Sequence, residues 1–131
     1  MDKMLLVGEY NPSLNELTGL SLGRMPIYQS KGMQSHMMKK KHFKALKYIN
    51  DVSSIILAPD YVGTDNSKDD PTIMFVKRYK DNIMIALRQS PSERYLYIAT
   101  MYDIADNKID RLVYSGRLKQ VIDISGQNDL L

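Results

Sequence analysis

The segment that decides the fold runs from residue 72 to residue 114. It contains "TIMFVKRY" (72–79), "IMIALR" (83–88), "YLYIATMYD" (95–103) and "IDRLVY" (109–114). The first three stretches are rich in β-branched and aromatic residues, and short polar segments separate all four. Strands joined by short turns pair as antiparallel neighbours. We therefore predict a four-stranded antiparallel meander over residues 72–114.

The sequence before this segment predicts mostly helices. "MLLVGEY" (4–10) and "MPIYQ" (25–29) are typical of short strands, the second at a sheet edge because Pro26 cannot donate to a ladder. Between Met33 and Ile49 the apolar residues follow a helical period that breaks before Phe43, which indicates a kink or two short helices meeting near His42. The predicted fold class is α+β, with N-terminal helices packed on one face of the meander.

The length of 131 residues fits a single domain. We divide it into an N-terminal extension (1–30), a basic helical half (31–59), the antiparallel sheet (72–114) and a tail (115–131). There is no cysteine, which excludes disulfides and thiolate chemistry. No apolar run approaches the ~20 residues that span a bilayer, and no signal peptide is recognisable at the N-terminus, so we expect a cytoplasmic protein without a membrane contact.

Positive charge is segregated in the helical half. The net charge is +3, yet residues 17–50 contain no acidic residue and seven basic ones: Arg24, Lys31, Lys39, Lys40, Lys41, Lys44 and Lys47. A concentrated positive potential attracts nucleic acid or an anionic membrane. A solvated, lysine-rich helix without a partner explains the same run of charge.

The chemistry available is that of metal-free RNA cleavage. His36 and His42 lie about 240° apart on a straight helix, so they do not share a metal, and no cofactor is expected. Cleavage by 2′-hydroxyl attack needs a base, an acid and cations around the phosphorane, roles that suit histidine, lysine and arginine.

Three strand residues are further candidates. Strict alternation places Tyr95, Tyr97, Ala99 and Met101 on one face of their strand, and Leu96, Ile98, Thr100 and Tyr102 on the other. Thr100 is a small hydroxyl among large neighbours, Tyr102 is able to stack on a base, and Arg88 ends its strand. The more common explanations are an ordinary β-former for Thr100 and a half-buried sheet aromatic for Tyr102, and a cation at the sheet rim also explains Arg88.

The order of short motifs is more specific than any one residue. "GMQSHMMKKKHFKALKYINDVSSIILAPDYVG" (32–63) is followed by a polar loop, "MFVKRYKDNIMIALR" (74–88) and "YLYIATMYDI" (95–104). This resembles the phage-associated branch of the metal-independent RNase superfamily typified by barnase, EndoU, colicin D and RelE toxins. The resemblance covers about residues 27–114. Its matching residues are His36, Lys40, His42, Pro59, Asp60, Tyr61, Ala99, Thr100 and Met101.

The resemblance implies a metal-independent endoribonuclease acting on tRNA or other structured RNA, in toxins, phages or mobile elements. It implies that His36 acts on the phosphate and that Thr100 lines the site. His42 matches a second histidine, and Phe43 stands where the family usually has proline, so the orientation of His42 depends on the helix break. Our candidate catalytic residues are His36, Arg88, Thr100, Tyr102 and His42; our candidate RNA-binding residues are Lys39, Lys40, Lys41, Lys77 and Arg78.

The expected partners are RNA and an immunity or antitoxin protein. Two other hypotheses stay open. One is a non-catalytic nucleic-acid-binding module, which the basic segment would serve. The other is a protein-interaction domain of a phage or mobile element, for which the nine methionines would form an adaptable surface.

Overall fold

The computed structural model describes residues 4–66, 71–92 and 94–121. The strands are β1 (Met4–Tyr10), β2 (Met25–Ser30), β3 (Tyr61–Asp65), β4 (Thr72–Arg78), β5 (Asn82–Gln89), β6 (Leu96–Asp103) and β7 (Leu118–Gln120). The α-helices are α1 (Asn15–Thr18), α2 (Met33–Lys39), α3 (Phe43–Leu46), α4 (Val52–Leu57) and α5 (Asp106–Tyr114). Two short 3₁₀ turns, Pro12–Leu14 and Ile49–Asp51, precede α1 and α4. None of the described helices is long and apolar enough to cross a membrane.

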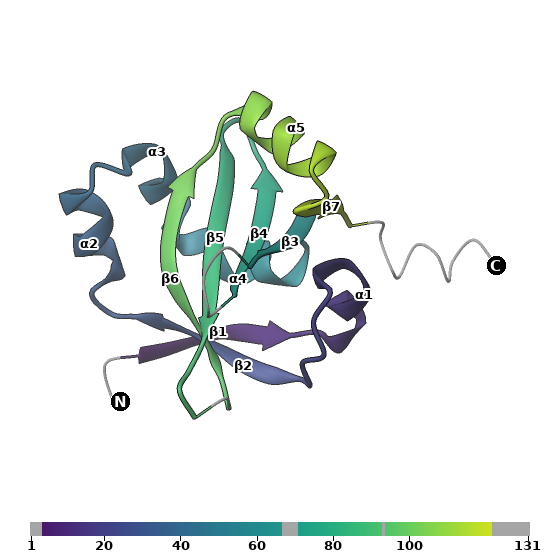
Figure 1. Ribbon diagram of the computed structural model, residues 1–131. Helices are drawn as coiled ribbons and strands as arrows, with labels where there is room; N and C mark the ends of the chain where they lie inside the picture. Colours follow the sequence, from purple (N-terminus) through teal and green to yellow (C-terminus); the bar gives the residue numbers. More distant parts are fainter. Residues whose placement is uncertain (1–3, 67–70, 93, 122–131) are drawn as a thin grey trace.

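All these strands form one seven-stranded mixed sheet, in the order β1-β2-β6-β5-β4-β3-β7 (Figure 1). The β2–β6 pair is parallel, and the other neighbours are antiparallel. The predicted four-stranded antiparallel meander under N-terminal helices is therefore wrong. Its first three strands are present as β4, β5 and β6, but β1 and β2 come before α2, α3 and α4 in the chain and extend the sheet beyond β6.

The segment 109–114 is a helix and not the predicted fourth strand. Ile109 and Leu112 are three residues apart, and in α5 they face the sheet together, with Ile109 fully buried. An apolar pair at that spacing fits one face of a helix better than one face of a strand. The chain then reaches the far edge of the sheet, where β7 pairs with β3.

The segment 25–30 is a strand, as predicted, but it is not at the sheet edge. β2 lies between β1 and β6, and its pairing with β6 involves only Ile27 and Tyr28. Pro26 pairs with Glu9 of β1 and lies outside the contact with β6. A residue without an N–H is tolerated here because the second ladder is so short.

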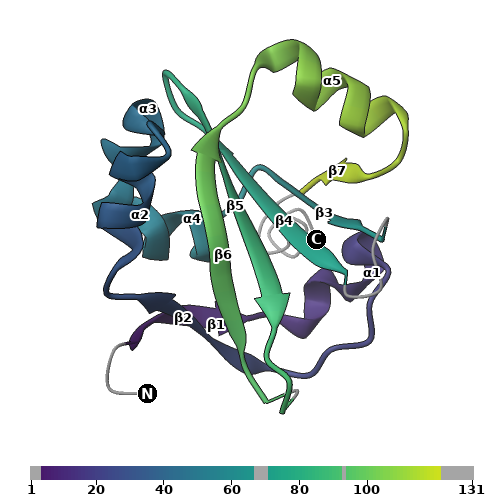
Figure 2. The same ribbon diagram turned by 60° about the vertical axis from the view of Figure 1, so that its left-hand side comes forward.

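Apolar side chains form a cluster on each face of the sheet. The larger cluster joins Ile55 of α4 and Met37 of α2 to Phe75, Ile85 and Met101 of the central strands. The smaller one lies on the opposite face under α5, and joins Met74, Val76, Met84, Ile104, Ile109 and Leu118, with Tyr61, Tyr102 and Leu112 at its margin. Figures 1 and 2 show α5 at one end of this second face and α2 and α3 beside β6. Much of the second face is therefore not covered by a helix.

The helix break near His42 is present, and it does not need a proline. Lys41 has a φ of 61°, the left-handed conformation. The N–H of Lys41 donates to Met38 O (3.1 Å), and the N–H of His42 donates to Met37 O (2.9 Å). These two bonds form a Schellman motif with lysine where glycine is usual. The motif ends α2, and α3 begins at Phe43 directly after His42.

Candidate functional site

A β-bulge at Ala99 decides which side chains of β6 share a face. Leu87 pairs with Ile98, but the next residue back along β5, Ala86, pairs with Thr100, so Ala99 is the extra residue. Ile98 and Met101 therefore both face the larger core. The strict alternation predicted from the sequence is wrong beyond this point. Thr100 and Tyr102 lie on the opposite face, the one that α5 covers only at one end.

Cross-strand pairing brings Arg88 and Tyr97 to the same face. Tyr97 pairs with Arg88 of β5 on one side and with Tyr28 of β2 on the other. Tyr28 also contacts Tyr95 edge to face, with ring centroids 5.4 Å apart. These side chains are half-buried, so part of each stays accessible. We call Arg88, Tyr97, Thr100 and Tyr102 the β6 face.

His42 completes the β6 face at its end nearest α3. Its imidazole centroid lies 6.0 Å from that of Tyr102, with the ring planes tilted by 38°. Both side chains are half-buried. The contact depends on the turn at Lys41, because that turn ends α2 and starts α3 beside β6. Two predicted site residues far apart in the sequence are thus brought together.

The environment of Tyr102 keeps its phenol protonated. Burial, and next the negative charge of Asp65, raise the pKa of Tyr102 above its ordinary value of 10.0. Its hydroxyl donates to Met84 Sδ at 3.0 Å. A thioether is a weak acceptor. The proton is therefore retained, and a stronger acceptor such as a phosphate oxygen could replace the sulfur.

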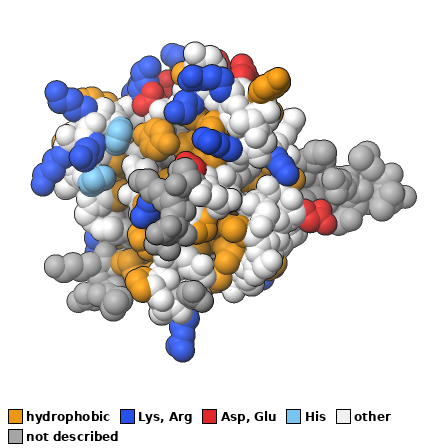
Figure 3. Space-filling model, viewed as in Figure 1, with side chains coloured by type: hydrophobic (Ala, Val, Ile, Leu, Met, Phe, Trp, Pro, Cys, Tyr) orange, Lys and Arg blue, Asp and Glu red, His pale blue; other side chains and the backbone are white. Residues whose placement is uncertain are grey.

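His36 and the lysines lie on the helical side of the β6 face. Met33 and Met37 anchor α2 in the core, whereas His36, Lys39, Lys40 and Lys41 are exposed. Figure 3 shows histidine side chains beside lysine and arginine side chains at the edge where α2 and α3 lie, next to an apolar area. Within the described residues, the ring contact between a histidine and a β6-face side chain is the one between His42 and Tyr102.

Lys77 and Arg78 have partners within the fold. Lys77 Nζ donates to Ala58 O at 2.8 Å and lies 3.6 Å from Asp60 Oδ1. Arg78 lies 3.2 Å from Asp106 Oδ1 and over the ring of Tyr61, 5.6 Å from its centroid. Asn82 and Arg78 together lower the pKa of Asp106.

The "PDY" motif belongs to the same network of contacts. Asp60 accepts the N–H of Arg78 through Oδ2 at 2.7 Å, and its own N–H donates to Val76 O. Pro59 is buried. In this structure the motif joins the end of α4 to the sheet, so its contacts account for Pro59, Asp60 and Tyr61 without a direct catalytic role.

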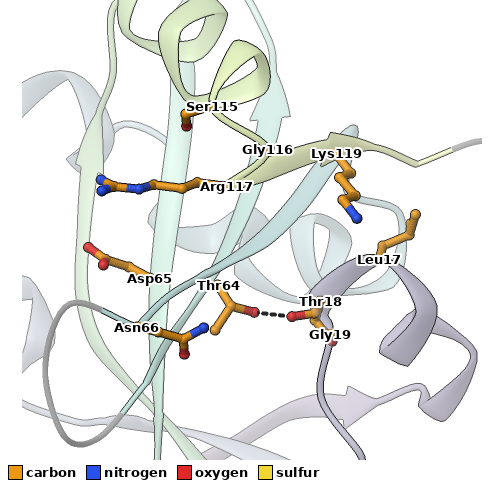
Figure 4. Close-up of a pocket in the computed structure, with 10 residues that line it drawn as sticks. All are labelled: Leu17, Thr18, Gly19, Thr64, Asp65, Asn66, Ser115, Gly116, Arg117 and Lys119. Carbon is orange, nitrogen blue, oxygen red and sulfur yellow. Dashed lines mark hydrogen bonds between the residues drawn. The ribbon is translucent and has the colours of Figure 1, made fainter.

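Sequence reasoning missed a basic residue at the β7 edge of the sheet. Arg117 lies in the turn between α5 and β7, within the segment predicted to be a tail. In Figure 4 the side chains of Arg117 and Asp65 extend to the same side, away from Lys119 and Leu17. The signal that was available is Gly116, which has a φ of 82° and ends α5, as glycine after an amphipathic helix often does.

The described residues contain no group of three or more histidine, cysteine, aspartate or glutamate side chains arranged to hold a metal ion. The chemical groups of the β6 face are an imidazole, a phenol, a hydroxyl and a guanidinium. Together they offer proton transfer and binding of an anion.

Comparison with protein families gives one match. The model of the family described as phage-Barnase-EndoU-ColicinE5/D-RelE like nuclease3 matches residues 5–111. No curated protein and no solved structure matches the chain. The match spans most of the sequence, including the helical segment with both histidines and all of β6. The chain therefore belongs to this family of nuclease-like domains of the barnase, EndoU, colicin and RelE type.

Proposed function

We propose that this protein is a metal-independent endoribonuclease whose reacting groups are on the β6 face. Family membership supports a nuclease. The single observation that carries the proposal is the contact of His42 with Tyr102, 6.0 Å between ring centroids, on a face that also holds Thr100 and Arg88. That contact joins a group suited to accept a proton with one suited to donate a proton.

The proposed step is attack of the ribose 2′-hydroxyl on the neighbouring phosphorus. His42 removes the 2′-hydroxyl proton as the P–O2′ bond forms, and Tyr102 donates its proton to the 5′-oxygen as the P–O5′ bond breaks. The products are a 2′,3′-cyclic phosphate and a free 5′-hydroxyl. Tyr102 then regains a proton from solvent or from the imidazolium of His42, so no further reactant is needed.

The assignment of the acid follows from the surroundings of Tyr102. The phenol is protonated through the neutral range and so has a proton to donate, and its raised pKa makes it a weaker acid than an exposed tyrosine. A phosphate oxygen is a much stronger acceptor than the sulfur of Met84, so a bound substrate would take over the hydrogen bond. An imidazole ordinarily titrates near neutrality, which suits histidine as the base.

The remaining candidates bind the substrate in this proposal. Arg88 and the exposed lysines Lys39, Lys40 and Lys41 neutralise phosphates, and Thr100 donates to a phosphate oxygen. His36 contributes a further phosphate contact at the edge of the basic segment. Tyr97 and Tyr28 are adjacent in register, so they offer half-exposed rings on which bases stack. RNA would then run along β6 from the tyrosines toward His42.

The test is cleavage of a defined RNA in the presence of EDTA. Purified protein is incubated with a single-stranded RNA and with a tRNA pool. A third substrate is the same single-stranded RNA with one 2′-deoxyribose at the mapped cut site. The proposal expects cutting of the RNA substrates, a 2′,3′-cyclic phosphate end, and no cut at the deoxy position. Cleavage that needs added divalent metal, or that persists at the deoxy position, would refute the mechanism.

A second candidate is an RNA-binding domain that does not cleave. It is favoured by the exposure of the lysines of α2 and of the turn after it, which suits phosphate binding without any proton transfer. It predicts affinity that falls steeply with salt and an RNA recovered intact. A toxin-like role, with an immunity or antitoxin protein as partner, belongs to the first proposal, that of an endoribonuclease.

A further inference from the structure

A polar pocket at the far side of the sheet has no role in the cleavage step proposed above. It has a volume of about 450 Å³ and lies between the end of α1, the end of β3 and the turn from α5 to β7 (Figure 4). We call it the α5–β7 pocket. It is lined by Leu17, Thr18, Gly19, Thr64, Asp65, Asn66, Ser115, Gly116, Arg117 and Lys119. Residues 115–119 are outside the part of the chain that the family model matches.

The walls of the pocket are held by specific backbone contacts. The carbonyl of Arg117 lies directly over Gly63, where any Cβ atom would collide with it, and it accepts the N–H of Thr64 at 3.2 Å. On the other side of the turn, the N–H of Gly116 donates to Val113 O and that of Arg117 to Leu112 O. The position of Arg117 is therefore set by the sheet and by the end of α5 together.

The wall formed by α1 is held by side chains. Thr64 Oγ1 donates to Thr18 O at 2.6 Å, which is the hydrogen bond drawn in Figure 4. The hydroxyl of Thr18 is in turn 3.0 Å from that of Tyr10, which is fully buried. Because these walls are already fixed, the lining residues lose little conformational entropy when a ligand binds.

The lining combines two cations and the carboxylate of Asp65 with neutral hydrogen-bonding groups. Arg117 and Lys119 carry positive charge, and Thr18, Asn66 and Ser115 offer donors and acceptors. Gly19 and Gly116 have no side chain, so a ligand could approach their backbone closely. A phosphate with a heterocyclic base matches this combination, and the volume is within the range of small-molecule pockets.

The pocket and the β6 face lie on one continuous sheet. In register, Gly63 pairs with Met74, Met74 with Ala86, and Ala86 with Thr100. Three steps between strands span about 14 Å from Gly63 to Thr100. Asp65 lines the pocket and also acts electrostatically on Tyr102. One RNA strand could therefore occupy both places.

We propose that the α5–β7 pocket binds one nucleotide of the RNA substrate beyond the scissile bond, with one flanking phosphate against Arg117, the other against Lys119 on the opposite side, and its base against the neutral lining groups. The inference rests on the proposed function for the identity of the ligand as RNA. The pocket itself is a nucleotide site whether or not the β6 face cleaves.

The test has a binding arm and a kinetic arm. In the binding arm, 5′-AMP, 5′-GMP, 5′-CMP, 5′-UMP and inorganic phosphate are titrated into the ¹⁵N-labelled protein. The proposal expects a nucleotide to shift the amide signals of Asn66, Ser115 and Gly116 more than those of His42 and Thr100. It also expects R117A/K119A to weaken that binding at least tenfold. The charge-matched control K108A/R111A, which changes two exposed basic residues of α5 outside the pocket, should leave it unchanged.

In the kinetic arm, R117A/K119A should raise KM for a short RNA about tenfold or more, with kcat within a factor of two, while the control variant behaves as wild type. Thermal melting of both variants checks that the fold is retained. Shifts that map elsewhere, or equal binding by the two double variants, overturn the inference. Failure of the wild-type protein to cleave any RNA counts against the proposed function, and the binding arm still decides the pocket.

Discussion

The imidazole of His42 and the phenol of Tyr102 lie 6.0 Å apart, centroid to centroid, although sixty residues separate them in the chain. Two local irregularities produce this contact. The left-handed conformation of Lys41 ends α2 and places His42 at the start of α3, beside β6. The bulge at Ala99 puts Tyr102 and Thr100 on the accessible face and keeps Met101 in the core.

Tyr102→Phe should lower kcat for RNA cleavage about 10²-fold or more, because the phenol is the proposed proton donor. The ring and its contact with His42 remain, so KM should change little. Single-turnover cleavage measures the effect. Tyr114→Phe is the control, since Tyr114 is 95% exposed on α5, and it should be without effect. Equal rates for wild type and Tyr102→Phe would remove Tyr102 from the mechanism.

Lys41→Gly should stabilise the protein by about 0.5–1 kcal/mol. Glycine adopts a φ near 61° without the strain that a lysine side chain brings, and this gain exceeds its extra entropy in the unfolded chain. Urea unfolding measures the difference. Lys39→Gly removes the same charge within α2, where glycine should instead cost about 1 kcal/mol. If the two variants shifted stability in the same direction, the account of the helix break would be wrong.

Gly63→Ala should destabilise the protein by about 2 kcal/mol or more, because its Cβ meets backbone atoms of Arg117 that have no room to move. The same collision would displace β7 and a wall of the α5–β7 pocket. Gly23→Ala is the control, since its Cβ would meet nothing within 4 Å, and its effect should stay within about 0.5 kcal/mol. Comparable losses for the two alanines would contradict the close contact of Gly63 with Arg117.

Stability should fall at alkaline pH as the tyrosines with a raised pKa, among them Tyr10 and Tyr102, titrate. Burial is the main cause that raises the pKa of Tyr10 and of Tyr102 above 10.0. Above the unfolded pKa, the unfolded chain therefore binds fewer protons than the folded one, so the free energy of unfolding decreases as pH rises. It should be level up to about pH 9 and decline from about pH 10. Tyr102→Phe should make the decline shallower when urea unfolding is measured at pH 8, 10 and 11. An unchanged slope would argue against the burial of this hydroxyl.

The sequence predicted those features that depend on local pattern. The strands 72–78, 82–89 and 96–103 and the break near His42 follow from residue type and period, and the structure confirms them. The family resemblance is confirmed by the family match. The place of "IDRLVY" after a third polar turn predicts a strand, yet the three-residue spacing of Ile109 and Leu112 against the sheet favours a helix.

Features that depend on pairing between distant strands could not be predicted. Nothing in "YLYIATMYD" indicates that Ala99 bulges, because the bulge is defined by the register with β5. The alternation was therefore assigned to the wrong faces beyond Ile98. Likewise, the place of β2 between β1 and β6, and the position of Arg117 over Gly63, arise only when the sheet is assembled.

The most direct test of the central claim is the single-turnover rate of RNA cleavage in EDTA for His42→Ala and His36→Ala, with wild type as reference. Both variants lose one imidazole from the same basic segment, and the ring contact with Tyr102 is the one made by His42. The account predicts a loss of about 10²–10⁴-fold for His42→Ala. For His36→Ala it predicts a loss below about tenfold, since a single exposed phosphate contact contributes little more. A His42→Ala rate equal to wild type, or a larger loss for His36→Ala, would contradict it.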